Sequence, residues 1–277
     1  MPFVELTSSP HAPEVRPVRI HYREVSSGPP IVFLHGGWGY GVYPVDQQID
    51  RQGDRQNGGQ LEALGAQFRF VIPDRSGYGR SSRVPIEMPI DFHRRAAEET
   101  LLVMDALGIE RAVFWGHSDG AVIAAKLGLL SPERCERLIL EAFHFHPNKP
   151  ASHNFFQRFA DHPEEVNAKA QSLLAADHGA RRWKQAIQRN CRVWLRLAAQ
   201  STCPDEDLYE GRLGELRVPV TFLHGKHDPR TEPDEMKRVQ EALPRAEMRF
   251  LENGRHSPHS ESACWSEFNS LLREVLA

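Results

Sequence analysis

Short apolar runs alternate with stretches of helical periodicity along most of the chain. Apolar runs bounded by glycine, proline or charged residues predict strands at 18–25, 31–37, 68–74, 111–117, 135–143, 218–225 and 246–253. Helical spacing of apolar residues covers 91–108, the stretch from Ser118 to about Leu130, about 232–243, and the chain from about Pro258 onward. Strands that alternate with helices form a parallel sheet covered on both faces. The pattern therefore predicts an α/β fold with a mostly parallel central sheet flanked by helices.

The alternation is interrupted in the second half of the chain. Between about 144 and 214 no strand pattern is present, while 163–179 and 180–200 have the periodicity of helices. We expect these helices to form a cap inserted before the strand at 218–225. The predicted division is a core of residues 1–143 and 215–277 with a helical cap of residues 144–214.

Composition and charge exclude several classes of partner. The chain has 277 residues, of which 40% are hydrophobic, and its formal charge of −3 offers no basic surface for nucleic acid or an anionic membrane. No apolar segment reaches the length of a membrane span and no leader pattern precedes the first strand, so we expect a cytoplasmic protein with a small-molecule substrate. The four cysteines show no C-x-x-C spacing and are predicted to be reduced thiols. The oligomeric state is left open.

A serine flanked by glycines lies between a predicted strand and a predicted helix. The sequence GHSDG places Ser118 between Gly116 and Gly120. A sharp strand-to-helix turn strains its central residue, and glycines two positions away on each side let the turn close. The pattern indicates that the Ser118 side chain projects outward at the end of its strand.

Three side chains with complementary chemistry follow different predicted strands. Functional loops of a parallel sheet converge at the carboxyl ends of its strands, and that rule brings together Ser118, Asp228 and His256. A hydroxyl becomes a nucleophile when an imidazole accepts its proton, and a carboxylate orients that imidazole. The predicted catalytic nucleophile, acid and base are therefore Ser118, Asp228 and His256. Two alternatives stay open, His259 as the base and an acid near Glu141 in place of Asp228.

The motifs, taken in chain order, resemble the α/β-hydrolase fold superfamily, in particular its serine-nucleophile members with a helical cap, such as esterases, lactonases and proline iminopeptidases. The resemblance covers nearly the whole chain and rests on HGG at 35–37, DRSGYGRSS at 74–82, GHSDG at 116–120, GKHDP at 225–229 and GRHSPH at 254–259. It implies that no cofactor is needed and that an oxyanion hole is formed by the backbone N–H groups of Asp119 and Gly37, with Trp38 as the alternative to Gly37. The serine argues against the epoxide hydrolases and haloalkane dehalogenases of this fold, which attack with an aspartate.

Several other side chains near the predicted site have two interpretations each. The Asp119 carboxylate either stabilises the start of its helix or orients a substrate. The loop 38–60, which is rich in aspartate and arginine, either lines the entrance or is a solvated surface. Four aromatic residues either form a substrate pocket or pack as core: Trp38, Phe155, Phe156 and Phe159.

Histidine is abundant, but no metal site is predicted. His144 and His146 share one face if the backbone is extended, yet no third ligand accompanies them at a recognisable spacing. The absence of such a ligand favours solvent-exposed or pocket-lining histidines.

Together these observations predict a serine hydrolase that cleaves a small or medium carboxylic ester or lactone through an acyl-enzyme formed on Ser118. An aminopeptidase of the proline iminopeptidase type, a C–C bond hydrolase and a cofactor-free haloperoxidase are alternatives on the same fold. The sequence HGGWG at 35–39 departs from the HGGPG expected of the iminopeptidases. A ligand-binding module without catalysis is the alternative from another class.

Overall fold

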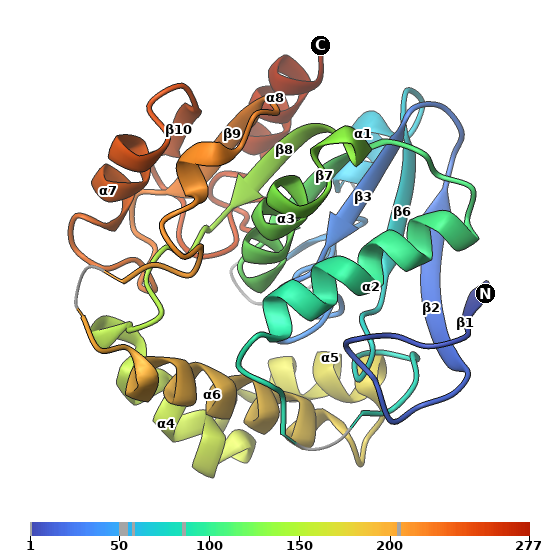
Figure 1. Cartoon of the computed structure of the whole chain (residues 1–277), viewed down its shortest axis with the longest axis vertical. Coiled ribbons are helices and arrows are strands. Elements are labelled where there is room, and N and C mark those ends of the chain that lie inside the picture. The colour runs from blue at the N-terminus through green and yellow to red at the C-terminus, as the bar shows by residue number, and fades with distance from the viewer. Residues whose placement is uncertain (1, 50–54, 57–58, 85–86, 204–205) are drawn as a thin grey trace.

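An eight-stranded sheet forms the centre of the computed structural model, which describes residues 2–49, 55–56, 59–84, 87–203 and 206–277 (Figure 1). The strand order is β1-β2-β6-β3-β7-β8-β9-β10. Neighbours from β6 to β10 are parallel, whereas β2 is antiparallel to both β1 and β6. The strands are β1 (Phe3–Leu6), β2 (Val18–Val25), β3 (Pro30–Leu34), β6 (Arg69–Pro73), β7 (Ala112–His117), β8 (Cys135–Glu141), β9 (Val220–Gly225) and β10 (Glu247–Leu251), with a separate short pair β4 (Gln48–Ile49) and β5 (Arg55–Gln56).

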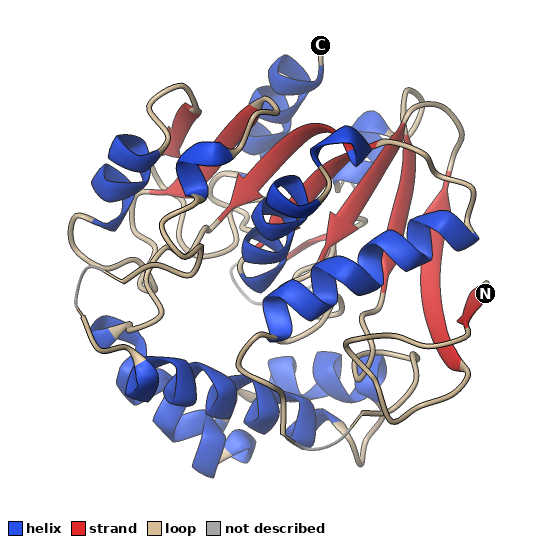
Figure 2. Cartoon of the chain, viewed as in Figure 1, coloured by secondary structure: helices blue, strands red, loops and turns tan. Residues whose placement is uncertain are grey.

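Helices cover both faces of this sheet, as Figure 2 shows. Along β3, Val32 and Leu34 face one core cluster and Ile31 and Phe33 face the other, because successive strand residues point to opposite sides. The first cluster includes residues of α2 (Phe92–Ala106), α3 (Asp119–Leu130) and α7 (Glu235–Ala242), and the second includes residues of α1 (Gln60–Leu64) and α8 (Trp265–Leu276). The predicted α/β fold with a mostly parallel sheet flanked by helices is confirmed.

Three further helices lie between β8 and β9 in the chain and beyond the carboxyl ends of the strands (Figure 1). They are α4 (Pro150–Asp161), α5 (Ala168–His178) and α6 (Trp183–Gln200). Phe156 of α4 stacks on Trp194 of α6, with ring centroids 5.5 Å apart and planes 3° from parallel. Their position places these helices over the edge of the sheet where the predicted catalytic residues lie.

The chain leaves β8 through a segment, 142–149, that we call the neck. The backbone N–H of Leu208, on the returning chain, donates to the carbonyl oxygen of Phe145 at 2.8 Å. The buried Glu235 carboxylate at the start of α7 accepts from the backbone N–H of Phe145 at 2.7 Å and from the Lys149 ammonium at 2.6 Å. The neck is therefore fastened both to the core and to the returning chain.

The structure differs from the predicted elements at both ends of the chain. Strand β1 was not predicted, because four residues are too few to show a period, and its pairing with β2 is what defines it. The last helix begins at Trp265 instead of near Pro258. The Glu261 carboxylate accepts the backbone N–H groups of Arg255 and Ser257 at 2.7 and 2.8 Å, which holds this stretch in turns.

None of the helices in the described part of the chain is both long enough and apolar enough to cross a membrane. The four cysteines are unpaired, with Cys135, Cys191 and Cys264 buried and Cys203 exposed.

Candidate active site

The turn from β7 into α3 has a strained serine at its tip. Ser118 has φ of 56° and ψ of −120°. Residues other than glycine rarely adopt these backbone angles. A Cβ atom at Gly116 would overlap the carbonyl oxygen of Gly120, and one at Gly120 would overlap that of Leu34 in β3. Both glycines are therefore required by close backbone approach, and the turn presents Ser118 at the carboxyl end of the sheet.

The structure brings Ser118, His256 and Asp228 into one hydrogen-bonded chain. Nε2 of His256 lies 3.1 Å from Oγ of Ser118, and Nδ1 of the same ring lies 3.0 and 2.9 Å from the two carboxylate oxygens of Asp228. Burial alone would raise the pKa of Asp228, but the charge and hydrogen bond of His256 hold that pKa well below its usual range. The carboxylate is ionised, so Nδ1 carries a proton and Nε2 is free to accept one from the serine.

The two alternative residues pair with each other instead. Nδ1 of His259 lies 2.8 Å from the Glu141 carboxylate, and Nε2 donates to the Tyr43 carbonyl oxygen at 3.1 Å. The other Glu141 oxygen accepts the Trp115 indole N–H at 3.1 Å. Since both nitrogens of His259 are bonded away from Ser118, neither alternative residue contacts the serine hydroxyl through its side chain.

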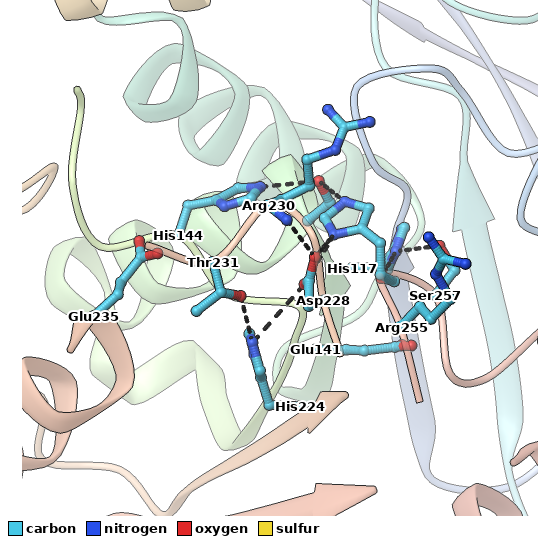
Figure 3. A network of polar contacts seen from close by, with 12 residues as sticks. His117, Glu141, His144, His224, Asp228, Arg230, Thr231, Glu235, Arg255 and Ser257 are labelled. Atoms are coloured by element: carbon cyan, nitrogen blue, oxygen red, sulfur yellow. Dashed lines mark hydrogen bonds and ion pairs between the residues drawn. The ribbon is translucent and has the colours of Figure 1, made fainter. Parts of the chain in front are cut away.

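A second imidazole contacts Ser118, which sequence reasoning missed. Nε2 of His144, in the neck, lies 3.2 Å from Oγ of Ser118, and its ring stacks on that of His256. Figure 3 shows His144 near Asp228 and Arg230. Burial lowers the pKa of His144 well below its usual value, and the charge of Lys149 lowers it further. His144 follows β8, so the rule that selected the other site residues, position just after a strand, would have selected it too. His146 points elsewhere, with Nδ1 3.2 Å from the carbonyl oxygen of Glu206.

The two residues predicted to supply the oxyanion donors line the pocket. Gly37 and Asp119 both line it together with Ser118. Within the described part of the chain, the backbone N–H groups of Gly37, Trp38 and Asp119 have no hydrogen-bond acceptor. The assignment of Gly37, with Trp38 as its alternative, stays a prediction.

The Asp119 carboxylate joins the core to α6. Its two oxygens accept the Asn190 amide N–H at 2.6 Å and the Trp194 indole N–H at 2.9 Å, and His93 lies 3.4 Å away. Burial opposes its charge, but the contacts with His93 and Trp194 keep the pKa of Asp119 below its usual value. Because these donors already occupy both oxygens, the carboxylate holds helix α6 over the nucleophile, a role that neither sequence interpretation included.

A pocket opens above Ser118 between the sheet and the helices. It is partly open to solvent, and Tyr43 and Arg230 contribute to its wall. Of the predicted pocket residues, Trp38, Phe155 and Phe156 line it. The fourth, Phe159, packs edge-on against the Trp38 ring, with centroids 5.3 Å apart.

The loop 38–60 reaches this pocket through Trp38 and Tyr43. Its positions Asp50, Arg51 and Asp54 lie outside the described residues. The prediction that this loop lines the entrance is therefore carried only by its first residues.

One group of potential metal ligands exists among the described residues, namely His117, Glu141 and His259. The Glu141 carboxylate and both nitrogens of His259 are already used in the hydrogen bonds given above. Nε2 of His117 contacts the Ser257 hydroxyl at 3.0 Å. These contacts describe an ion-paired cluster behind the active site, and no metal is assigned to it.

Comparison with known proteins places this geometry in a family. The family model described as alpha/beta hydrolase fold matches residues 29–183. The human serine hydrolase BPHL is 23% identical over 95% of this chain and 84% of its own length. A 2-hydroxy-6-oxo-6-phenylhexa-2,4-dienoate hydrolase of Comamonas testosteroni is 26% identical over 93% of this chain and 91% of its own length. A thermophilic esterase from Thermogutta terrifontis, solved with malate bound, superposes with a TM-score of 0.70 at 20% identity, covering 100% of this chain and 98% of that one. The family match spans more than half of the chain, and the chain belongs to the alpha/beta hydrolase fold family.

Proposed function

We propose that this hydrolase cleaves small or medium carboxylic esters or lactones through an acyl-enzyme formed on Ser118. The observation that carries the proposal is the chain of hydrogen bonds from Ser118 through His256 to Asp228. Ser118 lines a pocket together with Gly37 and Asp119, whose backbone N–H groups have no acceptor among the described residues. We also propose that residues 144–214 form a cap, since Phe155, Phe156, Asn190 and Trp194 line that pocket. The name of the human relative, a serine hydrolase, supports the same chemistry.

Acylation begins with attack of Oγ of Ser118 on the substrate carbonyl carbon. The hydroxyl proton passes to Nε2 of His256, and Asp228 stabilises the imidazolium that results. The carbonyl oxygen becomes negative and accepts the N–H groups of Gly37 and Asp119. His256 then gives its proton to the departing alcohol oxygen, and the acyl group remains on Ser118.

Deacylation repeats these steps with water, and His144 acts on the leaving oxygen. The proton of the resting Ser118 hydroxyl points at His256, so the neutral His144 ring contributes its N–H, through Nε2, to the same oxygen. Negative charge develops on Oγ as it leaves the acyl carbon. A hydrogen bond from His144 stabilises that charge and favours release of the acid.

The test is hydrolysis of 4-nitrophenyl esters of increasing acyl length by the wild type and by Ser118→Ala. We expect the wild type to cleave short and medium esters and the variant to lose about 10⁴-fold or more in turnover. Intact-mass measurement after acid quench should show the acyl group on Ser118. The control is Ser270→Ala on the exposed face of α8, which should keep full activity.

Absence of ester cleavage by the wild type, or full activity in Ser118→Ala, contradicts the proposal. The next substrates are then amides with an N-terminal proline and the dienoate named for the Comamonas relative. They test the two alternative activities, a proline iminopeptidase and a C–C bond hydrolase.

A further inference from the structure

Arg230 brings a positive charge into the pocket beside the nucleophile. It follows Asp228 by two residues, is half-buried, and lines the same pocket as Ser118 and His144. Its backbone N–H donates to the Asp228 carboxylate at 2.8 Å, which fixes where its side chain begins. In Figure 3 the guanidinium extends away from that carboxylate.

No carboxylate of the described chain pairs with this guanidinium. Asp228 is engaged by His256, and Asp119 by Asn190 and Trp194. Other buried arginines near the site use backbone carbonyl oxygens, as Arg75 does with those of His35 and Gly36. Among the described residues, the Arg230 guanidinium has neither kind of partner.

Two aromatic rings lie close to the guanidinium. The guanidinium carbon lies 3.0 Å from the ring centroid of Phe155 and 5.9 Å from that of Phe156. An aromatic ring attracts a guanidinium through its π face and offers no oxygen to accept the N–H bonds. Phe155 thus holds the cation in the pocket wall, and within the described part of the chain the N–H donors have no oxygen partner and are available to a ligand in the pocket. Burial lowers the pKa of Arg230 to about 10, so the group keeps its charge at neutral pH.

We propose that Arg230 binds a carboxylate of the substrate, so that the ester cleaved at Ser118 carries a second, negatively charged acid group. The planar fork of an arginine matches the two oxygens of a carboxylate. Phe155 and Phe156 flank the arginine in the pocket wall and suit an apolar chain between the ester and the acid. The substrate class is therefore the half-ester of a small dicarboxylic acid, an inference that rests on the proposed esterase function and narrows it.

The test compares two substrate series. One contains the monomethyl esters of glutaric, adipic and suberic acid, and the other contains the same esters with the free acid replaced by a carboxamide, which has the same shape and no charge. We expect the wild type to favour the best acid over its carboxamide by about 10- to 100-fold in kcat/KM, the usual worth of a hydrogen bond to a charged group. Arg230→Met, which still packs on Phe155, should lose this preference, and Arg230→Lys should keep part of it.

Arg158→Met is the matched control. Arg158 also lies over a phenylalanine of α4, 5.4 Å from the ring centroid of Phe159, but it is exposed and paired with Glu165. It should keep the full preference. As a measurement that needs no variant, glutarate should inhibit cleavage of 4-nitrophenyl acetate by the wild type competitively, and glutaramide should not.

Three results overturn the inference. They are equal rates for acid and carboxamide in the wild type, equal losses for both in Arg230→Met, and no inhibition by glutarate. If 4-nitrophenyl acetate is still cleaved through Ser118, the proposed function survives these results. If the wild type cleaves no ester at all, the proposed function fails first.

Discussion

The Ser118 hydroxyl has one proton and two imidazole neighbours. It can therefore donate a hydrogen bond to only one of the two rings. His256 must accept, because its other nitrogen donates to Asp228. A hydrogen bond between the His144 ring and the same oxygen then requires that ring to be the donor. In the proposed mechanism the serine oxygen has a base on one side and a donor on the other.

The variant His144→Phe tests the hydrogen bond from His144 to Oγ of Ser118. It keeps a ring against His256 and Trp194 but removes the N–H at Oγ. We expect kcat to fall by about 10- to 100-fold, the cost of a hydrogen bond to a charged oxygen, and KM to fall with it, because slower deacylation lets the acyl-enzyme accumulate. The rate at which the acyl-enzyme mass disappears after rapid mixing should fall by the same factor.

His146→Gln serves as the control, because that ring contacts a backbone carbonyl oxygen outside the pocket. Unchanged deacylation in His144→Phe would mean that His144 only fills space beside His256.

Among single residues, the sequence predicted those that lie within a recognisable motif. Ser118, Asp228 and His256 each follow a strand within a recognisable stretch, and the structure brings them together. His144 and Arg230 belong to no motif. The strand-end rule would have selected His144, but the contacts of His144 with Ser118 and of Arg230 with Phe155 join segments far apart in the chain, and periodicity and spacing do not encode such contacts.

At the scale of elements, the end of β8 is joined to the loop before α8 by a buried ion pair. Glu141 is the last residue of β8, and His259 lies three residues after His256. Burial opposes both charges, yet each partner favours the other's charge, so the pKa of His259 is raised and that of Glu141 is lowered. The pair fixes the loop that carries His256.

Glu141→Gln should reduce the free energy of unfolding by about 3–5 kcal/mol, since it leaves one partner of a buried pair without the other. His259 has a raised pKa in the fold, so its contribution is complete below its ordinary value of 6.5 and declines as pH rises through the raised value. Glu141 has a lowered pKa, so its contribution is complete above 4.5 and declines as pH falls. The difference from wild type should therefore be largest between these two values.

Urea unfolding over a pH series measures this difference. Glu136→Gln, an exposed change on the same strand, is the control and should have little effect at any pH. A Glu141→Gln difference that does not vary with pH would show that the pair is not ionised.

Elements were predicted where apolar spacing is long and regular. The central strands and α2, α3 and α6 agree with their predicted ranges to within a few residues. The start of α8, predicted near Pro258, is too early, because the Glu261 side chain accepts the backbone N–H groups of Arg255 and Ser257 and holds this stretch in turns. Local pattern does not show where a side chain will bond.

In the whole molecule, helices α4, α5 and α6 are held on the core in part by the Asp119 carboxylate. It accepts two hydrogen bonds from side chains of α6, immediately beside Ser118. Helix docking and the integrity of the site are thus coupled through one side chain. The sequence predicted an insertion here from its missing strands, but not this contact.

Trp194→Phe removes one of those donors while a ring can still stack on Phe156. We expect the amide hydrogens of α6 to exchange about 10- to 100-fold faster, because a bond to a buried charge is lost, while those of β7 keep their wild-type rates. Hydrogen exchange followed by mass spectrometry resolves the two segments.

Trp183→Phe, on the same helix and without a bond to Asp119, should leave exchange in α6 close to wild type. Equal acceleration in α6 and β7 would mean that the helices and the sheet open only together.

The neck separates the helices that line the pocket from the core residues that contact Ser118. Because Leu208 bonds back to Phe145, the long excursion that follows Lys149 starts and finishes at nearly the same point on the core. Excursions whose ends meet can be lengthened, trimmed or exchanged with little disturbance to the strands around them. His144 stays on the core side of that junction. A transplanted set of helices that keeps the two donors to Asp119 would therefore alter which molecules fit above Ser118 and leave its two imidazoles in place. Substrate preference could then change while the bond-breaking residues stay the same.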